Sequence, residues 1–232
     1  MWHWAHVPVR HCDPWWEHET EWHRNWKGCF PAECQEVVQL DNSTGEVHIA
    51  DVKAKNGYVI EFQNSKIELD ELDARERFYG NMVWVVNAAK FRSTFHILCK
   101  IPPPDSELAR QITIVRQPRI GRDWKEEVVF CWNSSISTPV AGLTLYNLGM
   151  VSKERTTLFE IREKVEKAYQ GHHLFQWQRP HAAWMSASKA VFLDFGDTYM
   201  WTIMKYNEST NCVVAVDKNA FIRAFGGGRS TL

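Results

Sequence analysis

The sequence predicts an α/β core within residues 1–100. Residues 46–63 hold two stretches rich in β-branched and aromatic residues, EVHIADVK and YVIEFQ, which flank the turn KNG and indicate a hairpin. Residues 68–79 (ELDELDARERFY) have the charged amphipathic pattern of a helix, which Gly80 would end. Residues 82–87 (MVWVVN) form a nearly continuous apolar run, typical of a short strand buried on both faces. Strands, helix and buried strand in this order are typical of an α/β domain.

The composition is that of an ordinary globular protein. The chain has 232 residues, of which 44% are hydrophobic and 24% charged, and this excludes a disordered, collagenous or low-complexity chain. Lys and Arg number 27 against 28 Asp and Glu, so the net charge is −1. No overall positive field draws the chain to nucleic acid or to a membrane. We therefore expect no membrane partner, and a nucleic-acid partner would have to be bound by a local patch.

The amino-terminal segment differs in composition from the rest of the chain. Six of the twelve tryptophans and five of the ten histidines lie in the first 26 residues. From Pro14 to Lys27 the spacing predicts a helix, with His18, Trp22 and Trp26 on one face. The start of the chain lacks the continuous apolar stretch of a secretory leader. The six cysteines are scattered, without a C-x-x-C pair, which favours reduced thiols and a cytoplasmic location.

The second half of the chain is predicted to be an α+β extension. Residues 101–107 (IPPPDSE) form a stiff, Pro-rich connector, so we place a candidate boundary between a core at 1–100 and an extension at 101–232. The extension is either separate from the core or packed on it as one domain. Residues 153–169 have the pattern of a charged helix, and residues 191–206 (VFLDFGDTYMWTIMKY) that of two strands joined by a Gly-Asp turn.

A basic segment lies in this extension. Residues 110–125 (RQITIVRQPRIGRDWK) carry five basic side chains against a single aspartate. The tryptophan in this segment is of the kind that stacks on an unpaired base. The candidates for contact with a phosphate backbone are Arg116, Arg119, Arg122 and Lys125. A solvated basic loop is the alternative interpretation.

The length of the hairpin loop decides whether two acids meet. Alternation along a strand places Glu61 and Gln63 on one face. A two-residue turn (NG) would pair Asp51 with Phe62 and put the two acids on opposite faces. A three-residue loop (KNG) with a left-handed glycine pairs Asp51 with Glu61 directly. We predict the three-residue loop, because only that register makes a site.

Two acids paired across strands favour a bound cation. In this register the two Cβ atoms lie about 5 Å apart. Like charges roughly 4 Å apart repel by about 1 kcal/mol in water and by about 4 kcal/mol at an effective dielectric constant of about 20. Hard oxygen ligands select Mg²⁺ or Mn²⁺, which also accept phosphate oxygens, so Asp51 and Glu61 are candidate metal ligands of a phosphodiester site. The alternative is that both acids belong to the wet face of an amphipathic hairpin.

Other polar side chains near these motifs have two interpretations each. His23 and Lys27 lie one turn apart on the predicted amino-terminal helix, where either could face a phosphate or both could be structural. Arg75 and Tyr79 either border the site or form an ordinary salt-bridged helix face. His48 lies on the opposite strand face from the acids by parity and is interpreted as a packing residue.

Several short motifs follow one another along the chain. They are HWAH with Cys12, then ETEWHRNWK, then HIADVKAKNGYVIEFQNSKI, and then ARERFYGNMVWVVN. Together they resemble the competence protein CoiA-like family over roughly residues 3–87, and FLDFGDTYMWTI further on is similar to carboxyl-terminal segments of that family. The resemblance implies a restriction-endonuclease-like, PD-(D/E)XK nuclease core, with a central mixed sheet flanked by helices.

The resemblance also implies roles for four residues. Asp51 and Glu61 would be the metal-binding acids, and Glu21 matches an additional acid that many such nucleases use. Gln63 takes the third position of the motif, where the general fold usually has lysine. Glutamine supplies no positive charge, although it can orient a water or a phosphate.

These observations predict a metal-dependent nuclease that hydrolyses phosphodiesters with Mg²⁺ or Mn²⁺. The resemblance implies that the substrate is DNA, that recombination proteins are partners, and that the setting is DNA uptake, recombination, or phage or mobile-element biology. The alternative is a module of the same fold that binds single-stranded DNA or a recombination protein without cutting. A purely structural, partner-binding protein would leave the paired acids without a purpose.

Overall fold

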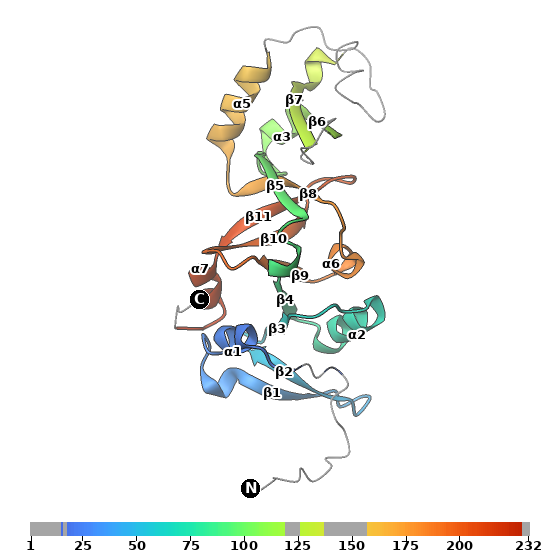
Figure 1. Cartoon of the computed structure of the whole chain (residues 1–232), viewed down its shortest axis with the longest axis vertical. Helices are drawn as coiled ribbons and strands as arrows, with labels where there is room; N and C mark the ends of the chain where they lie inside the picture. The colour runs from blue at the N-terminus through green and yellow to red at the C-terminus, as the bar shows by residue number, and fades with distance from the viewer. Residues whose placement is uncertain (1–14, 16–17, 119–125, 137–156, 229–232) are drawn as a thin grey trace, which may run out of the picture. The chain divides into compact units, whose positions relative to one another are not determined.

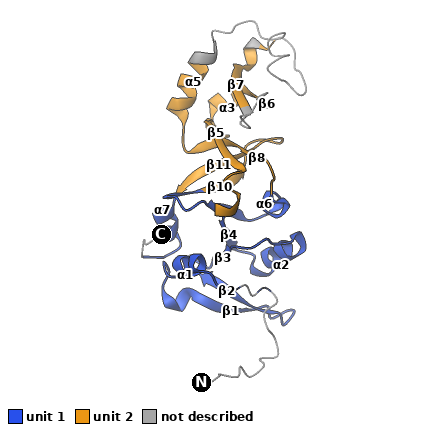
Figure 2. Cartoon of the chain, in the orientation of Figure 1, with its two compact units in different colours: residues 1–88, 181–200, 217–232 blue, residues 89–180, 201–216 orange. Residues whose placement is uncertain are grey.

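A computed structural model of the chain describes residue 15 and residues 18–118, 126–136 and 157–228 (Figure 1). The chain divides into two compact units, shown in Figure 2. Unit 1 comprises residues 1–88, 181–200 and 217–232, and unit 2 comprises residues 89–180 and 201–216. Unit 1 therefore combines most of the predicted core with two segments of the predicted extension.

Unit 1 is an α/β unit with a mixed sheet. The order β1-β2-β3-β4-β9 joins antiparallel pairs from β1 to β3 and parallel pairs from β3 to β9. These strands are β1 (Gln35–Leu40), β2 (Val47–Lys53), β3 (Val59–Gln63), β4 (Met82–Asn87) and β9 (Ala190–Asp194). The helices are α1 (Glu21–Lys27), the short η1 (Ala32–Cys34), α2 (Leu69–Tyr79), α6 (Ala182–Ser186) and α7 (Lys218–Ala224). The predicted class, a mixed sheet flanked by helices, is confirmed.

Helices pack on both faces of this sheet. Trp26 of α1 stacks on Phe62 of β3, with ring centroids 5.6 Å apart. On the opposite face, Trp84 of β4 contacts Trp184 of α6 and donates its Nε1 hydrogen to Glu76 of α2 at 3.0 Å. Because both faces are covered, the first five residues of β4 are all buried, as the apolar run predicts.

The amino-terminal helix begins later than the spacing predicts. Residues 18–20 are not helical, and α1 starts at Glu21. Thr20 caps the helix, because its hydroxyl accepts from the His23 backbone N–H and its own backbone N–H faces the His23 ring. The prediction of a helix from Pro14 is therefore wrong over these residues. Trp26 nevertheless lies on the inner face of α1 and is fully buried.

Unit 2 contains the remaining strands. Its strands follow the order β10-β11-β8-β5, and β6 and β7 form a separate antiparallel pair. They are β5 (Phe95–Lys100), β6 (Ile112–Pro118), β7 (Glu126–Trp132), β8 (His172–Trp177), β10 (Tyr199–Lys205) and β11 (Asn211–Asp217). The helices are α3 (Glu107–Gln111), α5 (Thr157–Ala168) and the short η2 (Ala89–Phe91) and η3 (Asn133–Ser135). Ile101, Ile161 and Leu174 are fully buried at the centre of its apolar core.

The local predictions in the later part of the chain are largely confirmed. β9 and β10 are the two strands expected at residues 191–206, and Gly196 between them takes a φ of +83°. α5 is the expected charged helix, whose predicted first residues, 153–156, lie outside the described part of the chain. The basic segment begins at the end of α3 and continues as strand β6 from Ile112 to Pro118, and its remaining residues lie outside the described part of the chain.

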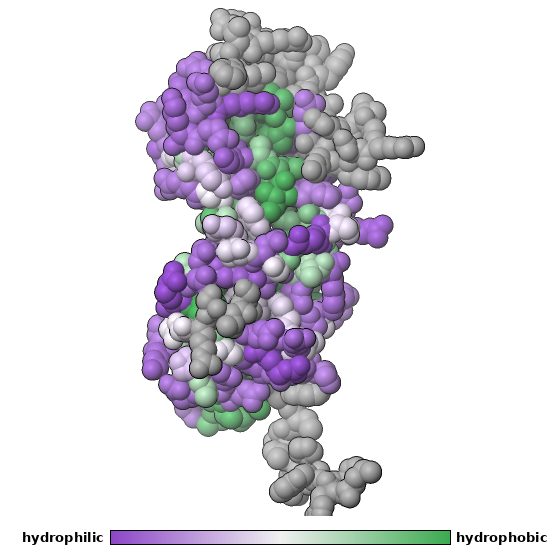
Figure 3. All heavy atoms as spheres, turned by 60° about the vertical axis from the view of Figure 1, so that its left-hand side comes forward, coloured by the Kyte–Doolittle hydropathy of each residue, from purple (hydrophilic) through white to green (hydrophobic). Residues whose placement is uncertain are grey.

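Three further features concern the described surface, the helices and the cysteines. Hydrophilic residues cover most of the described surface seen in Figure 3. No helix in the described ranges is long and apolar enough to cross a membrane. The cysteines within those ranges are free, and they are Cys29, Cys34, Cys99, Cys131 and Cys212.

Candidate functional site

The β2–β3 hairpin has the predicted three-residue loop. Ala54 and Tyr58 close the loop through a hydrogen bond from the Ala54 N–H to the Tyr58 carbonyl at 2.8 Å. Gly57 has a φ of +87°, the left-handed conformation that this loop requires. The strand pairs are Lys53 with Val59 and Val52 with Ile60. One step further along the same register, Asp51 lies opposite Glu61.

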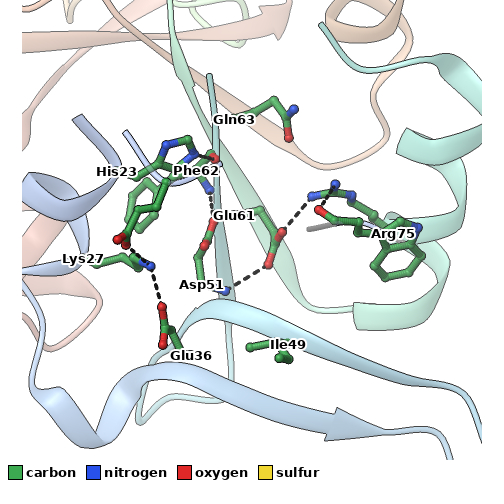
Figure 4. Close-up of a pocket in the computed structure, with 11 residues that line it drawn as sticks. His23, Lys27, Glu36, Ile49, Asp51, Glu61, Phe62, Gln63 and Arg75 are labelled. Carbon is green, nitrogen blue, oxygen red and sulfur yellow. Dashed lines mark hydrogen bonds and ion pairs between the residues drawn. The ribbon is translucent and has the colours of Figure 1, made fainter. Parts of the chain in front are cut away.

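At Asp51 and Glu61, hydrogen bonds between a side chain and the opposite backbone connect the two strands. The Asp51 backbone N–H donates to Glu61 Oε1 at 3.2 Å, and the Phe62 N–H donates to Asp51 Oδ2 at 2.9 Å. Each carboxylate therefore reaches the backbone of the opposite strand, as Figure 4 shows. Glu61 is only 4% exposed and Asp51 is partly buried, so the pair is not a fully solvated face of the hairpin.

Both carboxylates line one cavity of about 410 Å³. Side chains from α1, β1, β2, β3 and α2 line it, together with Trp15 and Glu19, which precede α1. Gln63, the third residue of the motif, lies in the same cavity and is 1% exposed. The structure thus brings together Asp51, Glu61 and Gln63, as the hairpin argument predicts.

Burial makes the charged form of this pair unfavourable. Burial and, after it, the nearby Asp51 carboxylate together raise the pKa of Glu61 to about 8, against the opposing effect of Arg75. Burial also raises the pKa of Asp51, although the Phe62 N–H counteracts the shift. A cation between the two acids would relieve both effects.

Arg75 of α2 holds Glu61 from one side. Its Nη1 donates to Glu61 Oε2 at 3.1 Å, and its Nη2 donates to the Trp15 carbonyl at 2.8 Å and to Glu71. The guanidinium carbon lies 5.5 Å from the centre of the Trp15 ring and 5.9 Å from that of Trp84. Of the two interpretations of Arg75, the structure supports the one in which it borders the site.

His23 connects α1 to β3. Its Nε2 lies 2.6 Å from the Phe62 carbonyl oxygen, and because a carbonyl can only accept, Nε2 carries the hydrogen. Its Nδ1 faces the Thr20 hydroxyl at 2.9 Å. Both ring nitrogens are therefore used in fixing the helix against the strand, and the residue is 4% exposed.

Lys27, the last residue of α1, enters the cavity from the other side. Its Nζ pairs with Glu36 Oε1 at 2.9 Å and with Glu19. Burial opposes the charge on Lys27, but the hydrogen bonds that its ammonium donates to Glu19 and Glu36 outweigh burial and raise the pKa of this lysine. The hydrogen bond from Lys27 likewise lowers the pKa of Glu19.

One predicted acid lies outside this group. Glu21 is exposed at the start of α1 and does not line the cavity, whereas Glu19 does. The reason is the helix start, since Glu19 lies before the Thr20 cap and pairs with Lys27, whereas Glu21 is the first residue of α1. Glu36 was also missed, because it depends on the pairing of β1 with β2. For Glu19, the signal available in the sequence is the acidic pattern E-x-E at residues 19–21, which offers Glu19 as an alternative to Glu21.

The predicted basic patch is described only at Arg116. This residue lies on β6 in unit 2, and its Nη2 donates to the Phe175 carbonyl at 2.7 Å. The other candidates, Arg119, Arg122 and Lys125, fall outside the described residues. His48, by contrast, is a packing residue as predicted, buried against the rings of Trp15 and Phe78.

The donor set at the cavity suits a hard divalent cation. Asp51 and Glu61 offer carboxylate oxygens, and Mg²⁺ is commonly held by one or two carboxylates together with waters and substrate phosphates. Within the described ranges, no group of three or more His, Cys, Asp or Glu side chains has an arrangement suited to a metal.

Comparisons with known proteins add nothing to this geometry. No family model matches the chain, and neither a curated protein nor a solved structure matches it.

Proposed function

We propose that the protein is a metal-dependent nuclease with a PD-(D/E)XK-like core. The observation that carries the proposal is the Asp51–Glu61 pair in one cavity, a partly buried and a buried carboxyl group whose pKa values are both raised. The order α1-β1-β2-β3-α2-β4, on a mixed sheet flanked by helices, supports the fold part of the proposal. The resemblance to the CoiA-like family favours DNA as the substrate.

The chain's own groups have distinct tasks in this proposal. Asp51 and Glu61 would hold Mg²⁺ or Mn²⁺, which supplies Lewis-acid activation of water and charge stabilisation at the phosphate. Gln63 provides an amide that can orient a water or a phosphate oxygen without adding charge. Arg75 fixes the rotamer of Glu61, and the Phe62 N–H fixes that of Asp51.

One observation favours the alternative function, a module that binds single-stranded DNA or a recombination protein without cutting. The Arg75–Glu61 ion pair already supplies one positive charge to the acid pair, at 3.1 Å. A cation must therefore share Glu61 with Arg75. Cleavage assays decide between the two functions.

The test compares the wild type with Asp51→Asn and Glu61→Gln, which keep the side-chain shapes. Each is incubated with single-stranded, double-stranded and branched DNA and with RNA, in Mg²⁺, Mn²⁺ or chelator. We expect cleavage by the wild type that needs the metal, and a loss on the order of a hundredfold or more in either variant. Gln63→Ala should lose less, because it removes orientation but no charge.

The control variant is Asp73→Asn, which changes an exposed acid on α2 and should cleave like the wild type. Cleavage that persists in chelator, or full activity in Asp51→Asn, would remove the nuclease assignment from this cavity. Binding of DNA without cleavage in every condition would establish the alternative.

A further inference from the structure

We propose that Lys27 is the side chain that contacts the phosphate of the bound substrate. This inference rests on the proposed function, because it places a nucleic-acid phosphate in the cavity of Asp51 and Glu61. It starts from a gap in the motif: the third position is Gln63, which carries no charge. Lys27 and Arg75 are basic residues that line this cavity.

Arg75 is committed to the protein. Its guanidinium bonds Glu61, Glu71 and the Trp15 carbonyl, and it lies near the rings of two tryptophans. Its side chain is 5% exposed. Moving it to a phosphate would leave Glu61 buried without its cation, which is costly. Arg75 therefore stays with Glu61.

Lys27 differs from Arg75 in the exposure of its partners. Its own side chain is 8% exposed, but Glu36 is 67% exposed and Glu19 is 37% exposed. Ion pairs to exposed carboxylates are weak, because water replaces the lost contact. The lysine can leave either acid for a phosphate oxygen while both acids return to solvent. An ammonium with three donors on a flexible stem suits this exchange.

The backbone conformation of Glu36 supports a defined position for its side chain beside Lys27. Glu36 has a φ of +52°, and among the described residues it is the one residue other than glycine with a positive φ. Such strain persists where surrounding structure imposes it, and it is concentrated at functional sites. The β1–β2 register pairs Gln35 with Val52 and Val37 with Ala50, which sets Glu36 opposite Asp51. Glu36 thus holds Lys27 beside the metal-binding acids.

The charges of the cavity explain why such a lysine is needed. Four acidic side chains line it, and in their ionised form they repel a phosphodiester. They are Glu19, Glu36, Asp51 and Glu61. Arg75 remains bound to Glu61. Of the lysine and arginine residues that line the cavity in the described ranges, Lys27 is therefore the one that can leave its carboxylate partners and bind the substrate phosphate.

The experiment measures binding of a fluorescent single-stranded oligonucleotide by anisotropy, in chelator, over a range of salt concentrations. Lys27→Gln should bind more weakly and lower the salt slope by about 0.7, the value for one lost phosphate contact on a single strand. Lys27→Arg should restore the slope. Glu36→Gln should bind more tightly than the wild type, because it frees Lys27 from a competing anion.

The matched control is Lys66→Gln, an exposed lysine paired with Glu68 outside the cavity, which should keep the wild-type slope. If Lys27 only fastens α1 to β1, then Lys27→Gln and Glu36→Gln both lower the melting temperature and neither changes the salt slope. That outcome overturns the inference. So does an unchanged salt slope in Lys27→Gln alone, and so does a failure of the wild type to bind the oligonucleotide. Failure of the proposed function has a different signature: the wild type binds but does not cut in Mg²⁺ or Mn²⁺.

Discussion

Unit 1 buries acids in two different ways. Asp194, at the end of β9, is 2% exposed and is surrounded by donors. Its Oδ2 accepts from the indole N–H groups of Trp22 at 3.0 Å and Trp26 at 2.9 Å, and its Oδ1 accepts from the Gly196 N–H and pairs with Lys218, both at 2.8 Å. Four donors thus converge on one carboxylate.

Glu61 is buried to a similar degree and Asp51 is partly buried, but this pair lacks such a surplus of donors. Burial raises the pKa of Asp194 too, but Lys218, the Gly196 N–H and Trp22 outweigh burial and leave that pKa below its ordinary value. At Glu61 burial prevails, and the neighbouring Asp51 carboxylate adds to it. Burial alone therefore does not determine the charge state of an acid in this unit.

The difference indicates what each acid is for. A carboxylate whose donors are complete holds elements together, and Asp194 joins α1, β9 and α7 through Trp22, Trp26 and Lys218. At the Asp51–Glu61 pair Arg75 compensates the negative charge only in part, and burial makes the ionised form of both acids unfavourable. The same chemical group thus joins elements of the fold at one position and, in the proposed function, would hold a cation at the other.

The largest expected effect that tests this comparison is on stability at Asp194. Asp194→Ala leaves Lys218 buried without its partner and two indole N–H groups unbonded, so the free energy of unfolding should fall by about 3–5 kcal/mol. Asp51→Ala removes one hydrogen bond to a backbone N–H and should lose only about 1–2 kcal/mol. Urea denaturation followed by circular dichroism measures both.

Asp73→Ala, on the exposed face of α2, serves as the control and should change stability by about 0.5 kcal/mol or less. Equal losses at Asp194 and Asp51 would contradict the distinction between the two environments.

The pH dependence of stability should differ in sign between the two acids. The folded pKa of Glu61 is raised to about 8 from 4.5, so its contribution to stability is complete below pH 4.5 and is lost as the pH rises toward 8. One proton gives a slope of up to about 1.4 kcal/mol per pH unit. For Asp194, whose pKa is lowered, the contribution is present above the unfolded pKa of 3.8 and is lost as the pH falls through the folded value.

Unfolding curves from pH 3 to pH 9, on the wild type and two variants, separate these contributions. Glu61→Gln should flatten the curve between about pH 5 and 8, and Asp194→Asn should flatten it on the acid side. Mg²⁺ should reduce the loss above neutral pH in the wild type. A wild-type curve with no decline between pH 5 and 8 would show that Glu61 is ionised throughout.

The proximity of Asp51 and Glu61 could be predicted from sequence because it depends on one local feature, the length of the hairpin loop. Asp51 and Glu61 lie ten residues apart on one hairpin, and a three-residue loop with Gly57 at its left-handed position sets the register. Strand alternation then adds Gln63. The same locality explains why the predicted bounds of α2, β4, β9 and β10 are close to the observed ones.

The other side chains of the cavity depend on contacts that spacing does not encode. Arg75 reaches Glu61 across 14 residues, and Glu36 requires both an unusual φ and the β1–β2 register. Glu19 replaces Glu21 because a Thr20 cap moves the helix start by several residues. The positions of these three side chains thus depend on a helix cap, on an unusual backbone angle or on the packing of a neighbouring element.

The tryptophans of the amino-terminal segment were recognised as unusual but without a role. Trp22 and Trp26 meet Asp194 across 172 and 168 residues, so the stretches ETEWHRNWK and FLDFGDTYMWTI, both part of the family resemblance, join at this acid. No periodicity within either stretch indicates that contact. It becomes visible only when segment 181–200 is found in the same unit as α1.

The smallest effect concerns one of these two donors. Trp22→Phe keeps most of the half-buried ring but removes the N–H that donates to Asp194 at 3.0 Å. Hydrogen bonds to charged groups contribute about 1.5–3 kcal/mol, and three other donors remain, so we expect a loss of about 1.5 kcal/mol. The pKa of Asp194 should rise, which moves acid unfolding to a higher pH. A double-mutant cycle supplies the control, because in the Asp194→Asn background the same change should have a smaller effect. If Trp22→Phe costs the same in both backgrounds, its contribution is ring packing, and the surplus of donors at Asp194 does not explain its lowered pKa.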